Sequence, residues 1–295
     1  MKCIIKYDPN IKDKEYDNLR SFDRTIEILG VKKLIQNNKN KFEIKELIKP
    51  YIKTEQFEKR ELHFKNTRFT GVLIQQYCNF KIKYQRIIDK GYNTEFYKNY
   101  LNYFKCWNEV FGIIHPPLNE YLCKAILFNV PFDEQKLLNN CFNHYYKNSF
   151  EINDKIYDDI INISEFILKH FNVNQIITDH HTTIGINNII DGVIKLTEID
   201  GMPDYIDDKG IYDLKCCNTD NRYFDVMQVL TYLCIYYITM FEQIKDIKQV
   251  KIINPILNRI HYINIDEFGK DNLLKFFQMM FDGYLGNRKI EIINI

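Results

Sequence analysis

The spacing of apolar residues divides the chain into a first part with helical periodicity and a later part rich in predicted strands. Between residues 69 and 112, apolar side chains recur every three or four positions, which is typical of amphipathic helices. His115-Pro116-Pro117 ends this stretch. Further helices are predicted at 20–36, 42–53, 118–128, 133–148 and 154–171. The first 170 residues show no alternation that predicts a long strand.

Beyond residue 172 the pattern changes to short runs enriched in Ile and Val and separated by turn residues. These runs predict strands at 173–184, 188–197, 202–206 and 210–216. A helix at 224–242, a hairpin of 249–254 and 259–265, and a last helix at 271–284 follow. The order predicts an α/β fold in which a mixed central sheet is flanked by helices, with a mostly helical N-terminal part.

The most informative pattern is a predicted hairpin that carries two aspartates and a lysine. Residues 207–210, with the sequence Asp-Asp-Lys-Gly, form a cluster typical of a turn. A turn centred on its two middle residues would make Asp204 and Asp213 face each other, with Cβ atoms ~5 Å apart. Asp213 and Lys215 would share one face of their strand, while Leu214 points into the core. A bulge in the turn would shift this register by one residue.

Two facing carboxylates repel each other unless a cation lies between them. Hard oxygen ligands suit Mg²⁺ or Mn²⁺, and such an ion can stabilise charge on a phosphate and activate water. Asp204 and Asp213 would bind the metal, together with the backbone carbonyl of Leu214. Lys215 would orient or help deprotonate the water, or offset charge on the phosphate. The alternative is a surface hairpin with ordinary polar residues.

Three pairs of residues carry a resemblance to a known family: Gly201 with Asp204, Asp213 with Lys215, and Gln228 with Tyr232. Their order resembles the PD-(D/E)XK nuclease superfamily, and within it the RecB-like and Cas4-like exonuclease branch, over about residues 188–265. The resemblance implies a restriction-endonuclease-like core, metal binding by the two aspartates and a catalytic Lys215. It also implies that Gln228 and Tyr232, at positions i and i+4 of one helix face, support the site or DNA.

The same resemblance implies a further acidic residue or histidine on an earlier helix. Glu165 is the candidate metal ligand, with a solvated helix residue as the alternative. His180 and His181 are a second option, and His170 is more consistent with a structural role. A weaker likeness at residues 69–77 divides the chain into a basic extension (1–60), a helical region that could bind DNA (61–150) and the nuclease core (151–295).

The eight cysteines form no C-x-x-C pair, so buried reduced thiols are expected. Many relatives in the Cas4-like branch hold an iron–sulfur cluster, with three of its cysteines after the helix that carries the Gln and Tyr. Here the last cysteine is Cys234, so no such cluster is expected. The chain also has no G-x-x-x-x-G-K-[ST] motif, and any helicase or recombination partner would therefore be a separate chain.

Composition and charge refine this picture. A chain of 295 residues, 45% hydrophobic and 27% charged, can form one large globular domain or two smaller ones. Residues 1–150 contain 26 Lys and Arg against 17 Asp and Glu, and the remainder contains 14 against 22. A basic half suits a polyanion and an acidic half suits metal ions, although uneven, solvated surface charge is the alternative.

Targeting signals and codon bias concern the location and source of the protein. No stretch of ~18 apolar residues predicts a membrane span, and the N-terminus lacks the apolar stretch of a signal peptide. An intracellular protein, in the cytoplasm or nucleus, is expected. The single alanine, with abundant Ile, Asn, Lys and Tyr, suggests an AT-rich genome such as that of a giant virus or phage.

The sequence therefore predicts a Mg²⁺- or Mn²⁺-dependent deoxyribonuclease that acts in DNA recombination, repair or genome processing. The basic segment 1–100 contains interspersed aromatic residues that could hold a phosphate backbone or stack on single-stranded bases. Two alternatives stay open. One is an RNA endonuclease of the same superfamily, in which His180 or His181 would matter. The other is a non-catalytic nucleic-acid-binding scaffold with a nuclease fold.

Overall fold

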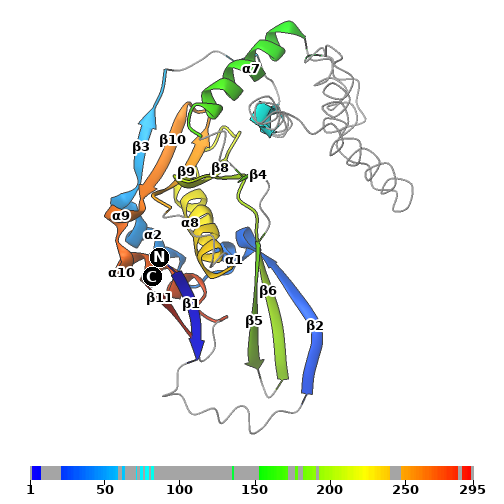
Figure 1. Cartoon of the computed structure of the whole chain (residues 1–295), viewed down its shortest axis with the longest axis vertical. Coiled ribbons are helices and arrows are strands. Elements are labelled where there is room, and N and C mark those ends of the chain that lie inside the picture. The colour runs from blue at the N-terminus through cyan, green and yellow to red at the C-terminus, as the bar shows by residue number, and fades with distance from the viewer. Residues whose placement is uncertain are drawn as a thin grey trace, which may run out of the picture.

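The structure is a computed structural model with mixed α/β architecture (Figure 1). It describes residues 2–7, 21–58, 62–63, 71, 74–75, 77–79, 81–82, 135, 153–171, 177–178, 182–190, 193–239, 247–284 and 288–293. The helices expected at 118–128 and 133–148 lie outside the described residues, apart from Gln135, which is helical. Among the described helices, none is long and apolar enough to cross a membrane.

The largest sheet has six strands in the order β3-β10-β9-β8-β7-β4. Their bounds are β3 Lys53–Gln56, β4 Ile177–Thr178, β7 Tyr205–Ile206, β8 Gly210–Leu214, β9 Gln249–Asn254 and β10 Arg259–Asn264. β8 and β9 run parallel, while the other neighbours are antiparallel. The prediction of a mixed sheet is confirmed, and the strands predicted at 249–254 and 259–265 agree with β9 and β10 to within one residue.

A three-stranded sheet and a strand pair complete the β-structure. The sheet has the order β2-β6-β5, with β2 Ser21–Gly30, β5 Thr182–Ile190 and β6 Val193–Gly201. The pair consists of β1 Lys2–Tyr7 and β11 Arg288–Ile293.

β2 corrects the helix that the sequence predicts at 20–36. Residues 21–30 form a ten-residue strand, and only α1, Val31–Asn37, is helical in that range. The expectation that the first 170 residues contain no long strand is therefore wrong. β2 pairs in parallel with β6, which lies far along the chain. Because this pairing is non-local, the apolar spacing within 20–36 does not reveal it.

Helices cover both faces of the six-stranded sheet. Besides α1 they are α2 Lys41–Ile48, α7 Asp154–Leu168, α8 Arg222–Thr239, α9 Ile265–Phe268 and α10 Lys270–Met280, with a 3-10 turn at Lys49–Tyr51. Figure 1 shows α8 at the centre of the molecule, with α1 and α2 nearby and α7 at the top of the view. The predicted helices at 154–171, 224–242 and 271–284 correspond to α7, α8 and α10.

Two apolar clusters hold these layers together. The larger surrounds α8 and includes Leu34 of α1, Ile44 of α2 and Phe277 of α10, all fully buried. The smaller joins Ile163 of α7 to Tyr205 of the hairpin, with several helical residues between 71 and 82.

The segment 1–60, expected as an extension, contributes strands and core residues to this arrangement. β1, β2 and β3 each pair with a strand from much later in the chain.

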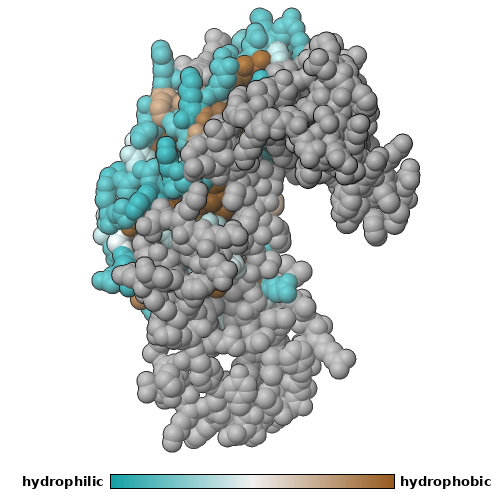
Figure 2. Space-filling view, viewed as in Figure 1, coloured by the Kyte–Doolittle hydropathy of each residue, from teal (hydrophilic) through white to brown (hydrophobic). Residues whose placement is uncertain are grey.

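Figure 2 shows that the outer surface over β3, α9 and α10 is largely hydrophilic.

Candidate active site

The β7–β8 hairpin has the register that the sequence predicts. Tyr205 pairs with Tyr212 and Ile206 with Ile211, so the turn contains two residues, 208 and 209. If this register continued by one residue, Asp204 would lie opposite Asp213 on β8. The ladder itself stops at Tyr205, because Asp204 lies in a bend just before β7.

The side chain of Asp207 holds the turn in this conformation. Its Oδ1 accepts hydrogen bonds from the backbone N–H groups of Lys209 and Gly210, both at 2.8 Å, and from the Tyr212 hydroxyl at 2.9 Å. Gly210 is required here because a Cβ at this position would lie 2.7 Å from the backbone oxygen of Gln249 on β9. The turn thus fixes both the hairpin register and its approach to β9.

The hairpin brings together the two aspartates and the lysine. Asp204 Oδ2 accepts a hydrogen bond from the backbone N–H of Leu214 at 2.6 Å, which ties its carboxylate to β8. Lys215 Nζ forms an ion pair with Asp213 Oδ2. The Lys215 N–H donates to Ile253 O at 2.9 Å and continues the pairing with β9. The predicted convergence of Asp204, Asp213 and Lys215 is therefore present.

Helix α8 supplies the other two predicted residues. Lys215 Nζ donates a hydrogen bond to Gln228 Oε1 at 3.1 Å, and Gln228 Nε2 donates to the Tyr232 hydroxyl at 2.5 Å. Burial, followed by the negative charge of Asp213, raises the pKa of Tyr232, so the hydroxyl stays protonated. A continuous chain of contacts thus runs from Asp213 through Lys215 into α8.

Gly201 allows α8 to lie this close to the end of β6. A Cβ at Gly201 would lie 2.9 Å from Ile235 Cδ1 and 3.0 Å from Tyr232 Cδ1. Any larger residue would push against the α8 face that carries Tyr232. This contact is the physical reason for a glycine three residues before Asp204.

Among the described residues, acidic side chains outnumber basic ones around Lys215. Asp213 is only 4% exposed. Burial alone would lower the pKa of Lys215, but Asp213 and the neighbouring Asp225 and Asp204 raise it above its ordinary value. Burial raises the pKa of Asp225 to about 6, against the opposing effect of Lys215. Three carboxyl groups therefore lie around one ammonium group. We call these residues, Asp204, Asp213, Asp225 and Lys215, the acidic cluster.

The donor set fits a hard divalent cation. Asp213 Oδ2 is buried and, apart from its ion pair with Lys215, has no hydrogen-bond partner. Mg²⁺ is commonly bound by one or two carboxylates, with water and phosphate oxygens completing its shell. Within the described residues no group of three or more His, Cys, Asp or Glu side chains is arranged to hold a metal. Asp204 and Asp213 would therefore need water, substrate or backbone oxygens as further ligands.

Within the described part of the chain, no hydrogen bond or ion pair joins Glu165 or His170 to the acidic cluster. Glu165 is exposed on α7, whereas its neighbours Ser164 and Ile167 are buried. The ring of His170 packs edge-on against Phe166, with centroids 5.0 Å apart, and burial lowers its pKa, which fits a structural role. His180 and His181 lie outside the described residues. At Leu214 the structure places the N–H against Asp204, and a metal-binding role of its carbonyl stays a prediction.

Two residues near the site were not among the predicted site residues. Gln75 Nε2 donates a hydrogen bond to Asp204 Oδ1 at 2.7 Å. Its helical segment approaches closely because Gly71 lies against Cys216, where a Cβ would be 2.8 Å from Cys216 Cβ. Asp225 precedes Gln228 by three residues on α8. This i, i+3 spacing on one helix face is the signal that identifies it.

Cys78, Cys216, Cys217 and Cys234 are free thiols. Cys78 and Cys234 are buried, as expected, while Cys216 and Cys217 are partly buried. Burial raises the pKa of Cys78 to about 12, so this thiol is protonated and unreactive at neutral pH.

A second polar cluster lies at the other end of the loop that follows β8. Asp220 Oδ2 is 3.0 Å from Arg222 Nη2 and 3.0 Å from Arg259 Nη1, and its Oδ1 is 3.3 Å from His261 Nε2. The other ring nitrogen of His261 lies 2.8 Å from Thr54 Oγ1. We call Asp220, Arg222, Arg259 and His261 the Asp220 cluster. Their contacts anchor the loop to β10, and the contact of His261 with Thr54 extends to β3.

Comparisons with known proteins leave the family open. No model of a protein family matches the chain, and no curated protein matches it. Among solved structures, the chain is similar to the crystal structure of SSO0001 at 19% sequence identity, over 65% of this chain and 86% of that one. The TM-score of 0.24 is too low for this likeness to establish a shared fold.

Proposed function

We propose that the protein is a metal-dependent nuclease that hydrolyses DNA phosphodiester bonds and has a core of the PD-(D/E)XK type. The observation that carries this proposal is the contact chain at the hairpin. Asp204 and Asp213 lie on either side of one turn. Lys215 forms an ion pair with Asp213, and its ammonium group also donates a hydrogen bond to Gln228 of α8. Two acids and a lysine in this arrangement suit phosphodiester hydrolysis.

Each residue has a role that its contacts support. Asp204 and Asp213 would hold Mg²⁺ or Mn²⁺, which when bound stabilises charge on the phosphate and lowers the pKa of water. Because its pKa is raised, Lys215 is positively charged at neutral pH. It is therefore suited to stabilising negative charge on the phosphate rather than to accepting a proton.

The surrounding residues position this lysine and one carboxylate. Gln228 accepts a hydrogen bond from the Lys215 ammonium and holds it beside Asp213, while Gln75 and the Leu214 N–H fix the two oxygens of Asp204. Preorganised groups of this kind account for a large share of catalysis in many enzymes. A role in recombination, repair or genome processing, with a separate helicase or recombination protein, belongs to the same proposal.

Cleavage assays on labelled substrates test this function. Purified protein is incubated with single-stranded DNA, duplex DNA and RNA of matched sequence, in Mn²⁺, in Mg²⁺ and in EDTA. We expect cleavage of DNA that requires the metal and falls by about a thousandfold in Asp213→Ala and Lys215→Ala. Lys248→Ala, which removes an exposed lysine of the same chain, should cleave normally. Cleavage that survives both site changes would refute the assignment, and cleavage of RNA alone would favour the RNA endonuclease.

A further inference from the structure

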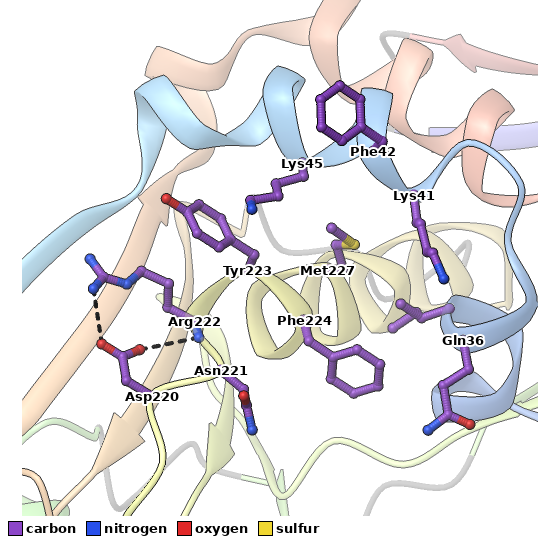
Figure 3. A pocket seen from close by; sticks show the side chains of 11 residues that line it. Gln36, Lys41, Phe42, Lys45, Asp220, Asn221, Arg222, Tyr223, Phe224 and Met227 are labelled. Atoms are coloured by element: carbon purple, nitrogen blue, oxygen red, sulfur yellow. Dashed lines mark hydrogen bonds and ion pairs between the residues drawn. The ribbon is translucent and has the colours of Figure 1, made fainter.

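A pocket of about 650 Å³ opens between α1, α2 and the first turns of α8 (Figure 3). Its lining is mostly apolar and aromatic, with a few charged side chains at its edge. The lining residues are Ile35, Gln36, Lys41, Phe42, Lys45, Asp220, Asn221, Arg222, Tyr223, Phe224 and Met227. We call it the α2–α8 groove. All of these residues are described, and they come from parts of the chain that are far apart in sequence.

Aromatic rings give this groove flat surfaces that can stack on bases. Phe42 is 67% exposed, an unusual state for a large apolar side chain. Tyr223 and Phe224 are partly exposed on the opposite side, on α8. Figure 3 shows these three rings and the side chain of Met227 around the groove. Every base has a π-face, so exposed rings of this kind bind unpaired bases without regard to sequence.

The charged side chains of the groove favour a polyanion. Lys41, Lys45 and Arg222 line it, against a single acid, Asp220, which leaves a net charge of +2. The ammonium group of Lys45 lies 4.7 Å from the centroid of the Tyr223 ring. A cation held over an aromatic ring can contact a phosphate while the ring stacks on the adjacent base.

Helix α8 joins the groove to the acidic cluster. Its Gln228 contacts Lys215, while Tyr223 and Met227 line the groove. Residues 216–221 connect Lys215 directly to the rim at Arg222. Helix α8 and residues 216–221 therefore connect the groove to the acidic cluster.

We propose that the α2–α8 groove binds a single-stranded segment of DNA next to the phosphodiester bond that the acidic cluster hydrolyses. This inference rests on the proposed nuclease function and specifies its substrate as DNA with an unpaired end or segment. Bases within a duplex are stacked on each other and cannot stack on Phe42 or Tyr223. Pockets of about this volume hold small organic molecules, which suits one or two nucleotides rather than a duplex.

Fluorescence anisotropy with the full chain tests the proposal. The probe is a fluorescein-labelled oligo(dT) of about 12 nucleotides, in EDTA so that metal-dependent cleavage does not occur. Phe42→Leu keeps an apolar side chain but removes the ring, and we expect its Kd to rise about tenfold. Phe42→Trp restores a stacking surface and should bind as the wild type does. A groove that binds an apolar peptide would tolerate leucine, so equal affinity of Phe42→Leu and wild type would overturn the proposal.

The lysines are tested by a matched pair of double variants. Lys41→Gln/Lys45→Gln removes two charges from the groove, and Lys270→Gln/Lys275→Gln removes two exposed charges from α10. The first should lower the slope of log Kd against log salt concentration by about 1.4, and the second should leave it unchanged. Equal slopes, or tighter binding of duplex DNA or RNA of matched length, would overturn the proposal. Thermal melting of each variant confirms that it is folded.

The binding and cleavage experiments distinguish failure of this proposal from failure of the nuclease function. If the wild type cleaves DNA but the groove variants bind oligo(dT) normally, the groove assignment is wrong and the nuclease function stands. If the groove variants lose binding while the wild type cleaves no nucleic acid in any metal, the groove assignment stands and the nuclease function falls.

Discussion

The acidic cluster and the Asp220 cluster lie at the two ends of one short loop, yet their charges are arranged in opposite ways. Asp220 is surrounded by Arg222, Arg259 and His261, so its carboxylate is fully compensated. In the acidic cluster, Lys215 is the cation in direct contact, and it lies among three carboxyl groups. Asp213 and Lys215 are more buried than the arginines of the Asp220 cluster, and burial magnifies any imbalance of charge.

This difference distinguishes a structural contact from a site that can accept a ligand. The Asp220 carboxylate has little to gain from a metal ion, because Arg222 and Arg259 both contact its Oδ2 and His261 contacts its Oδ1. Among the residues that the structure describes, the acidic cluster brings three carboxyl groups to one ammonium group, and a divalent cation bound there would offset this negative charge. The same reasoning predicts that removing a carboxylate lowers stability in the Asp220 cluster, whereas in the acidic cluster it raises stability or changes it little.

The largest effect on stability is expected at the compensated cluster. Asp220→Ala leaves Arg259 and His261 partly buried without their acidic partner, and should lower the free energy of unfolding by about 3–5 kcal/mol. Urea denaturation followed by circular dichroism measures this change. Asp158→Ala, at an exposed position of α7, serves as the control and should change stability by less than about 0.5 kcal/mol. A similarly small change in Asp220→Ala would show that the Asp220 cluster is not structural.

Gly201→Ala should have an intermediate effect. The added Cβ would lie 2.9–3.0 Å from atoms of Ile235 and Tyr232, and overpacking of this kind costs about 1–3 kcal/mol. Because Tyr232 accepts the hydrogen bond of Gln228, DNA cleavage should fall more than stability alone explains. Cleavage rates measured well below the melting temperature separate the two effects. Unchanged cleavage would show that this packing does not position Gln228.

Asp225→Asn should stabilise the protein above about pH 6. The pKa of Asp225 is raised in the folded state to about 6 from 3.8. Its favourable contribution is therefore complete below pH 3.8 and is lost as the pH rises through about 6. At pH 8 the asparagine variant should be more stable than the wild type by about 1–3 kcal/mol, and at pH 4 the two should be equal. Urea denaturation across this range in EDTA measures the difference, and a less stable variant at pH 8 would contradict the account.

Asp213→Asn is expected to have the smallest effect on stability. The amide keeps the shape of the side chain and removes one of three neighbouring negative charges, so the free energy of unfolding in EDTA should change by less than about 1 kcal/mol. Thermal melting in EDTA measures this change. A loss as large as that of Asp220→Ala would mean that Asp213 serves mainly to hold Lys215 in the fold.

The sequence predicts the parts of the site that local chemistry determines. The turn at residues 207–210 fixes the hairpin register through Asp207 and Gly210, and both residues are visible in the sequence. Because side chains alternate along a strand, Asp213 and Lys215 fall on the same face. Helical spacing places Gln228 beside Tyr232.

Long-range packing determines the rest, and sequence spacing does not report it. The contact of Gln75 with Asp204 depends on a helix approaching the hairpin from far away in the chain. The pairing of β2 with β6 and the meeting of α1, α2 and α8 around the groove are equally non-local. Glu165 is an exposed residue of a correctly predicted helix, and its role as a metal ligand stays a prediction.

Binding of Mn²⁺ measured by isothermal titration calorimetry tests the central claim most directly. The wild type and the exposed control Asp158→Ala should each bind Mn²⁺ at a site that Asp213→Asn abolishes, while all three proteins have similar melting temperatures in EDTA. This result would assign the excess charge of the acidic cluster to metal binding. Equal Mn²⁺ binding by the wild type and Asp213→Asn would contradict the account.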